Sequence, residues 1–203
     1  MDVSLVDSVV SSLENAFQRY FDSGKIPKRN GNSYASIAPY DSYKAKDGFV
    51  IIACGNQMLF EKLCLEVIEM PHIVDDERFL DIPLRVINNE ALKEFIEFWT
   101  VNHSVEYIVD FVLSKGIPAA PILNLKQIIE DEHIAKAREM FIDIEHPVIG
   151  AMKVNGNPVK LIDTMPKIEN PAPTLGQHNE EILIELLGIS LSEYEDLSRS
   201  GVI

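Results

Sequence analysis

The sequence is poor in cations, in cysteine and in long apolar runs. Only 18 of its 203 residues are Lys or Arg, against 32 Asp and Glu, so the net charge is −14. A surface this negative repels the phosphates of nucleic acids and of anionic membranes, and we therefore exclude both as partners. The longest basic stretch, Lys25–Arg29, holds three cations that Ile26 and Pro27 interrupt. The chain thus offers few clustered cations to a polyphosphorylated ligand.

The two cysteines, Cys54 and Cys64, lie in apolar surroundings. This setting is typical of reduced, buried thiols in a cytoplasmic protein. The longest uninterrupted apolar run, Phe49–Cys54, is far too short to span a bilayer. Because the first residues also lack the cationic start and apolar block of a signal peptide, we expect a soluble, cytoplasmic protein.

Familiar catalytic patterns are also missing. No Ser-His-Asp spacing, nucleophile elbow or pair of catalytic carboxylates can be singled out. His178 and Glu181 could share a helix face, but two ligands make a weak metal site, and acidic residues suit the first turn of a helix. His133, which also has acidic neighbours, has the same interpretation. We therefore assign no catalytic residue and no metal ligand from these patterns.

Apolar spacing and turn residues predict a mixed α+β chain. A broad apolar stripe from Val6 to Tyr20 predicts a helix over 4–21, and Asp47 and Gly48 mark the turn of a hairpin. The hairpin strands are expected over 42–45 and 49–54, and further strands over 141–144, 150–155 and 158–161. Further helices are expected over 58–69, 85–101, 105–114 with Ser104 as its N-cap, 125–138 with a break, 177–187 and 191–197, with an extended segment over 117–123.

Small and polar residues punctuate a long connection, 24–41, between the first helix and the hairpin. Long loops tend to be functional or disordered. Within this one, Asn30, Gly31, Asn32 and Ser33 are small, polar and flexible, as a loop that covers a substrate should be. A simple linker explains them equally well. These four residues are our candidates for a substrate loop.

A second candidate is the turn that follows the strand over 49–54. Gly55, Asn56 and Gln57 separate this strand from a predicted helix. Ligands often bind at the carboxyl ends of strands, where helix amides can meet an anion. The turn has no GxGxxG or GKS pattern, so a plain strand-to-helix turn is the alternative interpretation. These three residues are secondary ligand-facing candidates.

Three stretches carry a resemblance that extends over nearly the whole chain. The first joins residues 2–8 to SIAPYDSYKAKDGFVIIACGNQMLFEKLC (36–64), and the second is GIPAAPILNLKQIIEDEH (116–133). The third joins HPVIGAMKVNGNPVKL (146–161) to APTLGQHNEEILIELLG (172–188). In order and spacing they resemble the C-terminal half of the family III coenzyme A transferases, a family that includes formyl-CoA transferase, carnitine CoA-transferase and α-methylacyl-CoA racemase.

The resemblance implies an enzyme that transfers CoA between carboxylic acids, with a coenzyme A thioester as substrate and no metal. In the family, an aspartate attacks the thioester to form a mixed anhydride, and the reaction then passes through an aspartyl-CoA intermediate. That aspartate and most of the CoA pocket belong to the N-terminal half of the members, so we expect this chain to be inactive alone. The alternatives are a racemase-like or carnitine-type member, or a noncatalytic subunit that pairs with a separate catalytic half.

The implied fold is α+β. A small domain of antiparallel strands with packed helices, 37–140, would follow a linker helix and loop, 1–36. A C-terminal strand-plus-helix segment, 141–203, would pack on a large domain. In formyl-CoA transferase a glycine-rich loop closes over the substrate, and its counterpart here would be Asn30–Ser33, with one glycine. Since the family forms interlocked dimers, we expect a homodimer or a partnership with the catalytic half.

Overall fold

The structure, a computed structural model, describes residues 3–203. It divides into two compact units, Met1–Ile122 and Leu123–Ile203. Each unit combines helices with a small antiparallel sheet, so the expected α+β class is confirmed. The three-part division at residues 36 and 140 stays a prediction. In the part of the chain that the structure describes, no helix is both long enough and apolar enough to cross a membrane.

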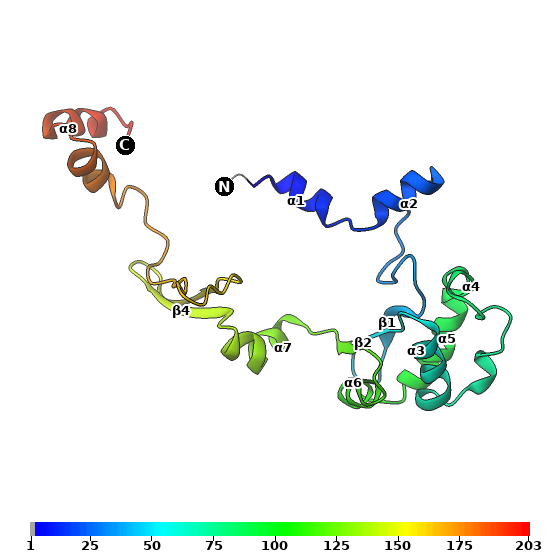
Figure 1. Ribbon diagram of the computed structural model, residues 1–203. Helices are drawn as coiled ribbons and strands as arrows, with labels where there is room; N and C mark the ends of the chain where they lie inside the picture. Colours follow the sequence, from blue (N-terminus) through cyan, green and yellow to red (C-terminus); the bar gives the residue numbers. More distant parts are fainter. Residues whose placement is uncertain (1–2) are drawn as a thin grey trace. The chain divides into compact units, whose positions relative to one another are not determined.

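A three-stranded antiparallel sheet organises the first unit (Figure 1). Strands β1 (Tyr40–Lys44) and β2 (Phe49–Ala53) form the predicted hairpin. The third strand, β3 (Ala119–Pro121), pairs with the other edge of β2 and lies in the segment expected to be extended. The alternate β2 side chains Val50 and Ile52 are completely buried, so the central strand turns one face to the core.

Helices pack against this sheet and complete the core of the first unit. They are α3 (Gln57–Lys62) with the π-helical continuation Leu63–Val67, the short turn Pro71–Ile73, α4 (Ile82–Ile87), α5 (Asn89–Thr100) and α6 (Val105–Ser114). Ser104 caps α6 as predicted, because its hydroxyl accepts a hydrogen bond from the Tyr107 amide. The core contains Tyr43, Phe60, Leu63, Phe79, Leu92, Ile96, Ile108, Val112 and Ile117.

The helix expected over 85–101 is wrong as a single element, because the chain breaks at Asn88 between α4 and α5. The Asn88 backbone has φ −102° and ψ 23°. Its side-chain amide donates to the carbonyl oxygens of Leu84, at 2.9 Å, and Arg78, at 3.1 Å. An Asn side chain that bonds nearby carbonyls competes with the helical ladder, which explains a break that apolar spacing alone does not reveal.

Side chains from the helices fix the hairpin. The Thr100 hydroxyl donates to the Lys44 carbonyl oxygen at 2.7 Å, and the Glu97 carboxylate accepts from the Lys44 amide at 2.9 Å. At the turn, the Asp47 carboxylate accepts from the Val105 amide at 2.8 Å. The edge strand β1 therefore has polar partners beyond its neighbour β2.

The single helix expected over 4–21 is also wrong. The chain forms α1 (Leu5–Ser11) and α2 (Ala16–Ser23), separated by a bend at Glu14, whose φ is 51°. A residue in the left-handed conformation cannot continue a right-handed helix, and the sequence around Glu14 gives no sign of this conformation. Neither helix has a buried residue, and Phe21 is 71% exposed.

Four aromatic side chains, spaced four residues apart, form a stacked ladder at the junction of α5 and α6. Ring centroids are 4.5 Å apart for Trp99 and His103, 4.9 Å for His103 and Tyr107, and 5.6 Å for Tyr107 and Phe111. The Lys115 ammonium lies 5.4 Å from the Phe111 ring centroid. Tyr107 and Phe111 lie four residues apart on one face of α6, whereas Trp99 belongs to α5 and His103 to the turn between the two helices, so this turn brings the first two rings onto the other two. Trp99 is the only tryptophan of the chain.

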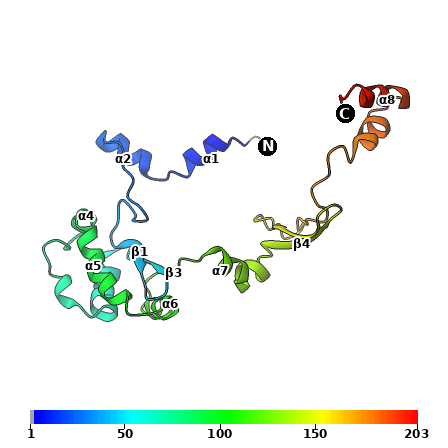
Figure 2. The same ribbon diagram turned by 180° about the vertical axis from the view of Figure 1, so that it is seen from behind.

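The second unit contains a two-stranded hairpin and short helices (Figure 2). Its elements are α7 (Leu125–Glu130), the π-helical Glu132–Ala137, β4 (Phe141–His146), β5 (Gly150–Asn155), the π-helical Glu181–Leu186 and α8 (Leu191–Arg199). The expected break within 125–138 is confirmed at Asp131, which caps the next helix. The strand expected over 158–161 is wrong; Pro158, which has no N–H for a ladder, lies in an irregular segment that follows β5.

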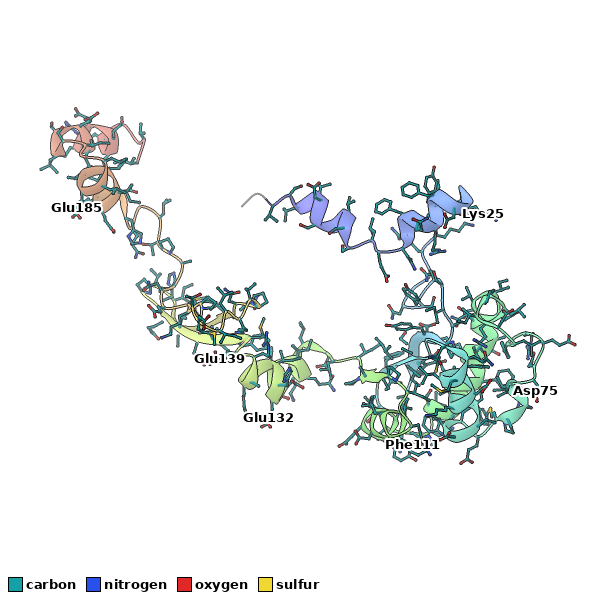
Figure 3. All side chains as sticks on the ribbon, in the orientation of Figure 1. Lys25, Asp75, Phe111, Glu132, Glu139 and Glu185 are labelled. Atoms are coloured by element: carbon teal, nitrogen blue, oxygen red, sulfur yellow. The ribbon has the colours of Figure 1, made fainter. Side chains whose placement is uncertain are left out.

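Little of the second unit is buried within the chain. Of residues 123–203, only Gly156 is fully buried. Figure 3 shows Glu132, Glu139 and Glu185 projecting from its ribbon into open space. Every buried hydrophobic side chain in the described residues 3–203 instead lies between Ala38 and Ile117. The second unit therefore has no hydrophobic core of its own.

Candidate functional site

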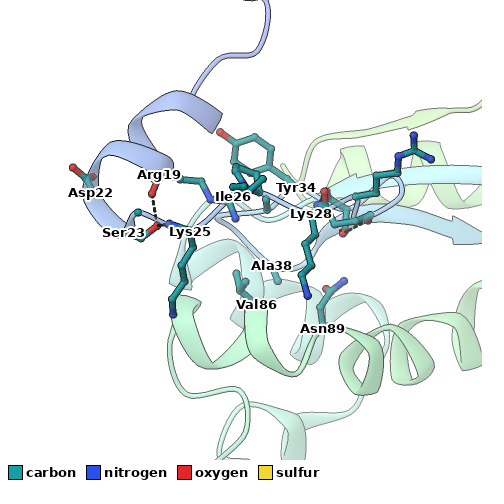
Figure 4. Close-up of a pocket in the computed structure, with 16 residues that line it drawn as sticks. Arg19, Asp22, Ser23, Lys25, Ile26, Lys28, Tyr34, Ala38, Val86 and Asn89 are labelled. Atoms are coloured by element: carbon teal, nitrogen blue, oxygen red, sulfur yellow. Dashed lines mark hydrogen bonds between the residues drawn. The ribbon is translucent and has the colours of Figure 1, made fainter.

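The first unit has a cleft of about 1060 Å³. One wall is the end of α2 with the chain that follows it, and the other includes Val86 of α4 and Asn89 of α5 (Figure 4). The lining residues are Arg19, Asp22, Ser23, Gly24, Lys25, Ile26, Pro27, Lys28, Arg29, Asn30, Ser33, Tyr34, Ala35, Ala38, Val86 and Asn89.

The cleft concentrates positive charge in an acidic chain. Arg19, Lys25, Lys28 and Arg29 line it, against the single carboxylate of Asp22. The whole chain carries a net charge of −14. Within residues 3–203, none of these four cations forms an ion pair with a carboxylate of the chain. Unpaired cations gathered in one concavity raise the local concentration of anions.

The end of α2 directs the chain into the cleft. Gly24 adopts the left-handed conformation, with φ 66°, and its amide donates to the Tyr20 carbonyl oxygen at 2.7 Å. This αL cap ends the helix. The Ser23 hydroxyl then accepts from the Lys25 amide at 3.1 Å while donating to the Arg19 carbonyl oxygen at 2.6 Å. The first lysine of the cleft is thus placed by a defined turn.

The predicted substrate loop is a self-bonded turn. The Asn30 side-chain amide donates to the Ser33 carbonyl oxygen, and the Ser33 hydroxyl donates back to the Asn30 carbonyl oxygen at 2.7 Å. Gly31, with φ 65°, supplies the left-handed residue that this tight turn requires. The Asn32 side-chain amide donates to the Ser42 hydroxyl at 3.1 Å and so attaches the loop to β1.

Tyr34 fastens the end of the loop. Its amide donates to the Tyr40 carbonyl oxygen at 2.8 Å, and its ring centroid lies 5.3 Å from that of Tyr40. Its hydroxyl accepts from the Asn15 side-chain amide at 2.9 Å and donates to the Glu14 carboxylate at 3.1 Å. The bond to Glu14 raises the pKa of Tyr34 above its ordinary value, because it stabilises the protonated phenol.

Below the loop, Ala38 is held by the buried side chain of Arg85, which is 1% exposed. Arg85 Nε donates to the Ala38 carbonyl oxygen at 2.9 Å, and its Nη1 donates to the Phe79 carbonyl oxygen at 2.8 Å and to Gln57 Oε1 at 2.9 Å. Its guanidinium lies 4.2 Å from the centroid of the Phe60 ring. Burial lowers the pKa of Arg85, although the group remains a cation.

Asp41, next to the cleft, has its negative charge balanced by an ion pair within the chain. Its carboxylate, almost fully buried, pairs with the Lys93 ammonium at 3.1 Å and accepts from the side-chain amide of Asn89 at 3.3 Å. Because Asn89 also lines the cleft, this bond fixes a polar side chain in its wall. The pairing with Lys93 offsets the repulsion that Asp41 would otherwise exert on an anion nearby.

Asn30 and Ser33, two of the four substrate-loop candidates, line the cleft, whereas Gly31 and Asn32 do not. Gly55, Asn56 and Gln57 lie outside it, and the side chains of Asn56 and Gln57 have structural partners. Asn56 caps α3 by accepting from the Leu59 amide at 3.0 Å, and Gln57 accepts from Arg85. The ligand-binding roles of both sets of residues stay predictions.

Sequence reasoning missed the cationic members of this site. Lys25, Lys28 and Arg29 were visible as a short basic stretch, but the fourth cation, Arg19, belongs to a helix. Only the turn at Gly24 brings Arg19 into the same lining as the loop. Asn89 is a further 56 residues along the chain from Ser33, and packing alone places it in the opposite wall. The useful signal was a basic stretch in a chain with few cations.

The cysteines and histidines offer no competing site. Burial raises the pKa of Cys54 and Cys64 to about 12, so both thiols stay protonated and unsuited to nucleophilic attack. Among the described residues, no three His, Cys, Asp or Glu side chains gather as metal ligands would. His178 bonds to Glu181 at 3.0 Å on the surface of the second unit.

Known proteins match the chain over most of its length. A family model described as CoA-transferase family III matches residues 1–179. The succinyl-CoA:mesaconate CoA-transferase of Haloarcula hispanica is 37% identical over 188 residues, which cover 91% of this chain and 46% of the relative. The succinyl-CoA:glutarate CoA-transferase of Mus musculus is 30% identical over 206 residues, covering 100% of this chain and 46% of the relative.

Solved structures give the same result. The crystal structure of a CAIB/BAIF family protein from Brucella suis superposes with a TM-score of 0.71 and 33% sequence identity. The match covers 92% of this chain and 47% of that one. The chain therefore spans about half the length of the relatives and the solved structure that it matches.

Proposed function

Because this chain belongs to CoA-transferase family III, we propose that it contributes the C-terminal half of an enzyme that transfers coenzyme A between carboxylic acids. The observation that carries the proposal is the family match over residues 1–179, together with relatives that are about twice as long. The proposed substrates are an acyl-CoA thioester and a free carboxylic acid. A metal plays no part in the proposed reaction.

The substrate class follows from the names of the relatives. The two relatives described above are named for succinyl-CoA, with mesaconate in one case and glutarate in the other. Succinate, mesaconate and glutarate are all short dicarboxylates. We infer that the whole enzyme uses a dicarboxylyl-CoA donor and a dicarboxylate acceptor, and the cationic cleft of this chain suits such acids. These names favour transfer between acids over racemase-like or carnitine-type chemistry.

The covalent step belongs, in this proposal, to the other half of the enzyme. Attack on a thioester needs an activated nucleophile. In the cleft the one carboxylate is Asp22, which is exposed and lies among cations, and the two thiols of the chain are buried elsewhere. We therefore expect the chain to position substrate and to lack transferase activity when alone.

The proposed assembly is a homodimer or a complex with the catalytic half. The uncovered apolar faces of α1 and α2 support this, since contiguous apolar surface in a water-exposed helix marks a contact with another protein surface. The linker (1–36), small domain (37–140) and C-terminal segment (141–203) would contact that half separately. The two free cysteines favour a reducing, cytoplasmic location.

A chimera tests the proposal. The segment of the mouse succinyl-CoA:glutarate transferase that matches this chain would be replaced by residues 1–203, and glutaryl-CoA formation from succinyl-CoA and glutarate would be followed by chromatography. We expect transfer by the chimera and none by the 203-residue chain alone. Transfer by the chain alone would contradict the proposed division of labour. A folded chimera that binds CoA but transfers nothing to any short acid would contradict the proposed function.

A further inference from the structure

We propose that the cleft binds a short-chain dicarboxylate, with Lys25 and Lys28 as its charged ligands. The inference rests on the proposed function, which supplies the dicarboxylate, and adds the place where the acid is held. It starts from the charge of the lining, four cations against one carboxylate.

The two lysines have the arrangement that a two-headed anion needs. Figure 4 shows the Lys25 and Lys28 side chains extending from the same segment toward α4 and α5, over Val86 and Asn89. Asp22, the carboxylate of the lining, points away from them in the same view. Two ammonium groups on one side of a cleft bind a dicarboxylate more tightly than a monocarboxylate, because each of its two carboxylates then has its own cation.

Polar and apolar neighbours complete the chemistry. Asn89 and Ser33 lie in the lining as uncharged hydrogen-bonding groups, and Asn89 is held in place by Asp41. Val86 offers an apolar surface between the lysine side chains, which suits the methylene groups of succinate or glutarate. A monocarboxylate of the same length would use only one of the two cations.

The helix ends in the lining bear on whether the bound anion is a carboxylate or a phosphate. Phosphate sites in proteins commonly use the amides at a helix N-terminus, where the helix dipole is positive. Here α2 presents its carboxyl end to the cleft, with Ser23 and Gly24 in the lining, and that end carries partial negative charge. Asn89, the first residue of α5, also lines the cleft, so the helix ends do not separate the two kinds of anion, and the phosphate probes of the test below do so.

Binding in an open cleft with exposed lysines is weak and depends on salt. Salt weakens attraction between solvent-exposed charges, and Lys25 and Lys28 are both exposed. We expect a dissociation constant in the millimolar range for glutarate in dilute buffer. The affinity should fall as sodium chloride is added.

The test is a titration of the full 203-residue chain, followed by NMR chemical shifts and calorimetry. Glutarate, mesaconate and succinate are the dicarboxylate probes, butyrate is the monocarboxylate probe, and inorganic phosphate and free CoA are the phosphate probes. We expect saturable binding of the dicarboxylates, with the largest shifts at Lys25, Lys28 and Asn89, and no saturation by butyrate.

The double variant Lys25→Gln, Lys28→Gln should weaken glutarate binding about tenfold, the order expected for removal of charge-assisted contacts. Lys160→Gln, Lys167→Gln is the matched control, because it removes the same charge from the second unit. Its affinity for glutarate should equal that of the unaltered chain. All four lysines are at least partly exposed, so both variants should fold normally, which circular dichroism checks.

Three results would overturn the inference. They are the absence of saturable glutarate binding, an equal loss of affinity in both double variants, and lysine-dependent binding of phosphate or CoA without binding of dicarboxylates. Activity of the chimera is independent of these readouts. An active chimera with no glutarate binding by the chain would refute only the dicarboxylate site, whereas glutarate binding with an inactive chimera would refute only the proposed transferase function.

Discussion

Arg85 places a cation in the core of the first unit, and no carboxylate of residues 3–203 forms an ion pair with it. Its hydrogen-bond partners are the carbonyl oxygens of Ala38 and Phe79 and the side chain of Gln57. Ala38 lines the cleft, whereas Gln57 begins α3. One buried side chain therefore links the base of the substrate loop to the turn after β2. The two stretches singled out from the sequence are connected through a residue that the sequence did not distinguish.

Replacing Arg85 with Met should destabilise the chain by about 3 kcal/mol, because it leaves buried carbonyl oxygens without a donor. Urea unfolding followed by circular dichroism measures the loss. Arg85→Lys keeps the charge but not the fork of donors, and should recover only part of the stability. Arg78→Met is the control for an exposed arginine. A loss for Arg85→Met no greater than that of this control would contradict the linking role.

The ion pair of Asp76 should make the stability of the fold depend on pH under acidic conditions. Arg78 donates to its carboxylate from Nη2 at 2.7 Å and from Nε at 3.0 Å, and these bonds lower the pKa of Asp76 from 3.8 to about 2. A depressed pKa contributes stability that is present above pH 3.8 and is lost as the pH falls through about 2. An NMR titration of the Asp76 carboxyl group checks the value.

In Arg78→Gln, the Asp76 pKa should rise toward its ordinary value, since the donating guanidinium is gone. The stability that Asp76 loses on acidification would then largely disappear, because the pKa of its carboxyl group would be similar in the folded and the unfolded chain. An unchanged titration of Asp76 in this variant would mean that other groups lower its pKa.

At the scale of elements, helix ends explain both the successes and the failures of prediction. The hairpin, the Ser104 cap and the break at Asp131 follow from local side-chain chemistry that is visible in the sequence. The breaks at Glu14 and Asn88 depend on backbone conformations that the larger apolar pattern conceals. Prediction from the sequence succeeded at recognisable turn and cap residues, and failed at Glu14, an ordinary helix former, and at Asn88, whose side chain bonds nearby carbonyl oxygens.

The candidate site was predicted only in part for a different reason. Asn30 and Ser33 were identified from composition, and both line the cleft. Arg19, Val86 and Asn89 join it through the turn at Gly24 and the packing of α4 and α5. Contacts between residues distant in the chain have no local signal, so a cationic lining assembled from several segments cannot be seen in a single sequence.

Glu69 offers a test of how these helices end. It follows the π-helical segment Leu63–Val67 with φ 54°, and the Met70 amide donates to the Cys64 carbonyl oxygen at 2.8 Å. Glycine adopts this conformation without strain, so Glu69→Gly should raise the free energy of unfolding by about 1 kcal/mol. Urea denaturation measures the gain.

Glu66→Gly is the matched substitution inside the same helical segment. It should lower the free energy of unfolding by about 1 kcal/mol, because glycine is a poor helix former. Equal effects of the two substitutions would show that the left-handed conformation at Glu69 is not strained.

At the scale of the whole molecule, the two units differ in how much they bury. The first unit has a continuous core, whereas the second has a two-stranded hairpin and short helices with only Gly156 buried. A lone hairpin is marginally stable in water. The second unit therefore depends, in the proposed enzyme, on surface that the other half supplies.

Hydrogen exchange measures this dependence in the intact chain. Amides of β2 should be strongly protected, and those of β4 and β5 should exchange about a hundredfold faster, because protection follows the free energy of local opening. In the chimera, the β4 and β5 amides should gain protection. Equal protection of β2 and β4 in the chain alone would contradict the prediction.

The position of Trp99 turns the aromatic ladder into an optical probe. Since this is the only tryptophan and it stacks on His103 at 4.5 Å, indole fluorescence reports the first unit alone. Far-ultraviolet circular dichroism, by contrast, sums the helices of both units. Recording the two signals through one denaturant series would therefore distinguish the unfolding of the first unit from that of the second, with no added fluorescent label. The same experiment in the presence of a bound partner would show whether the two unfolding transitions then coincide.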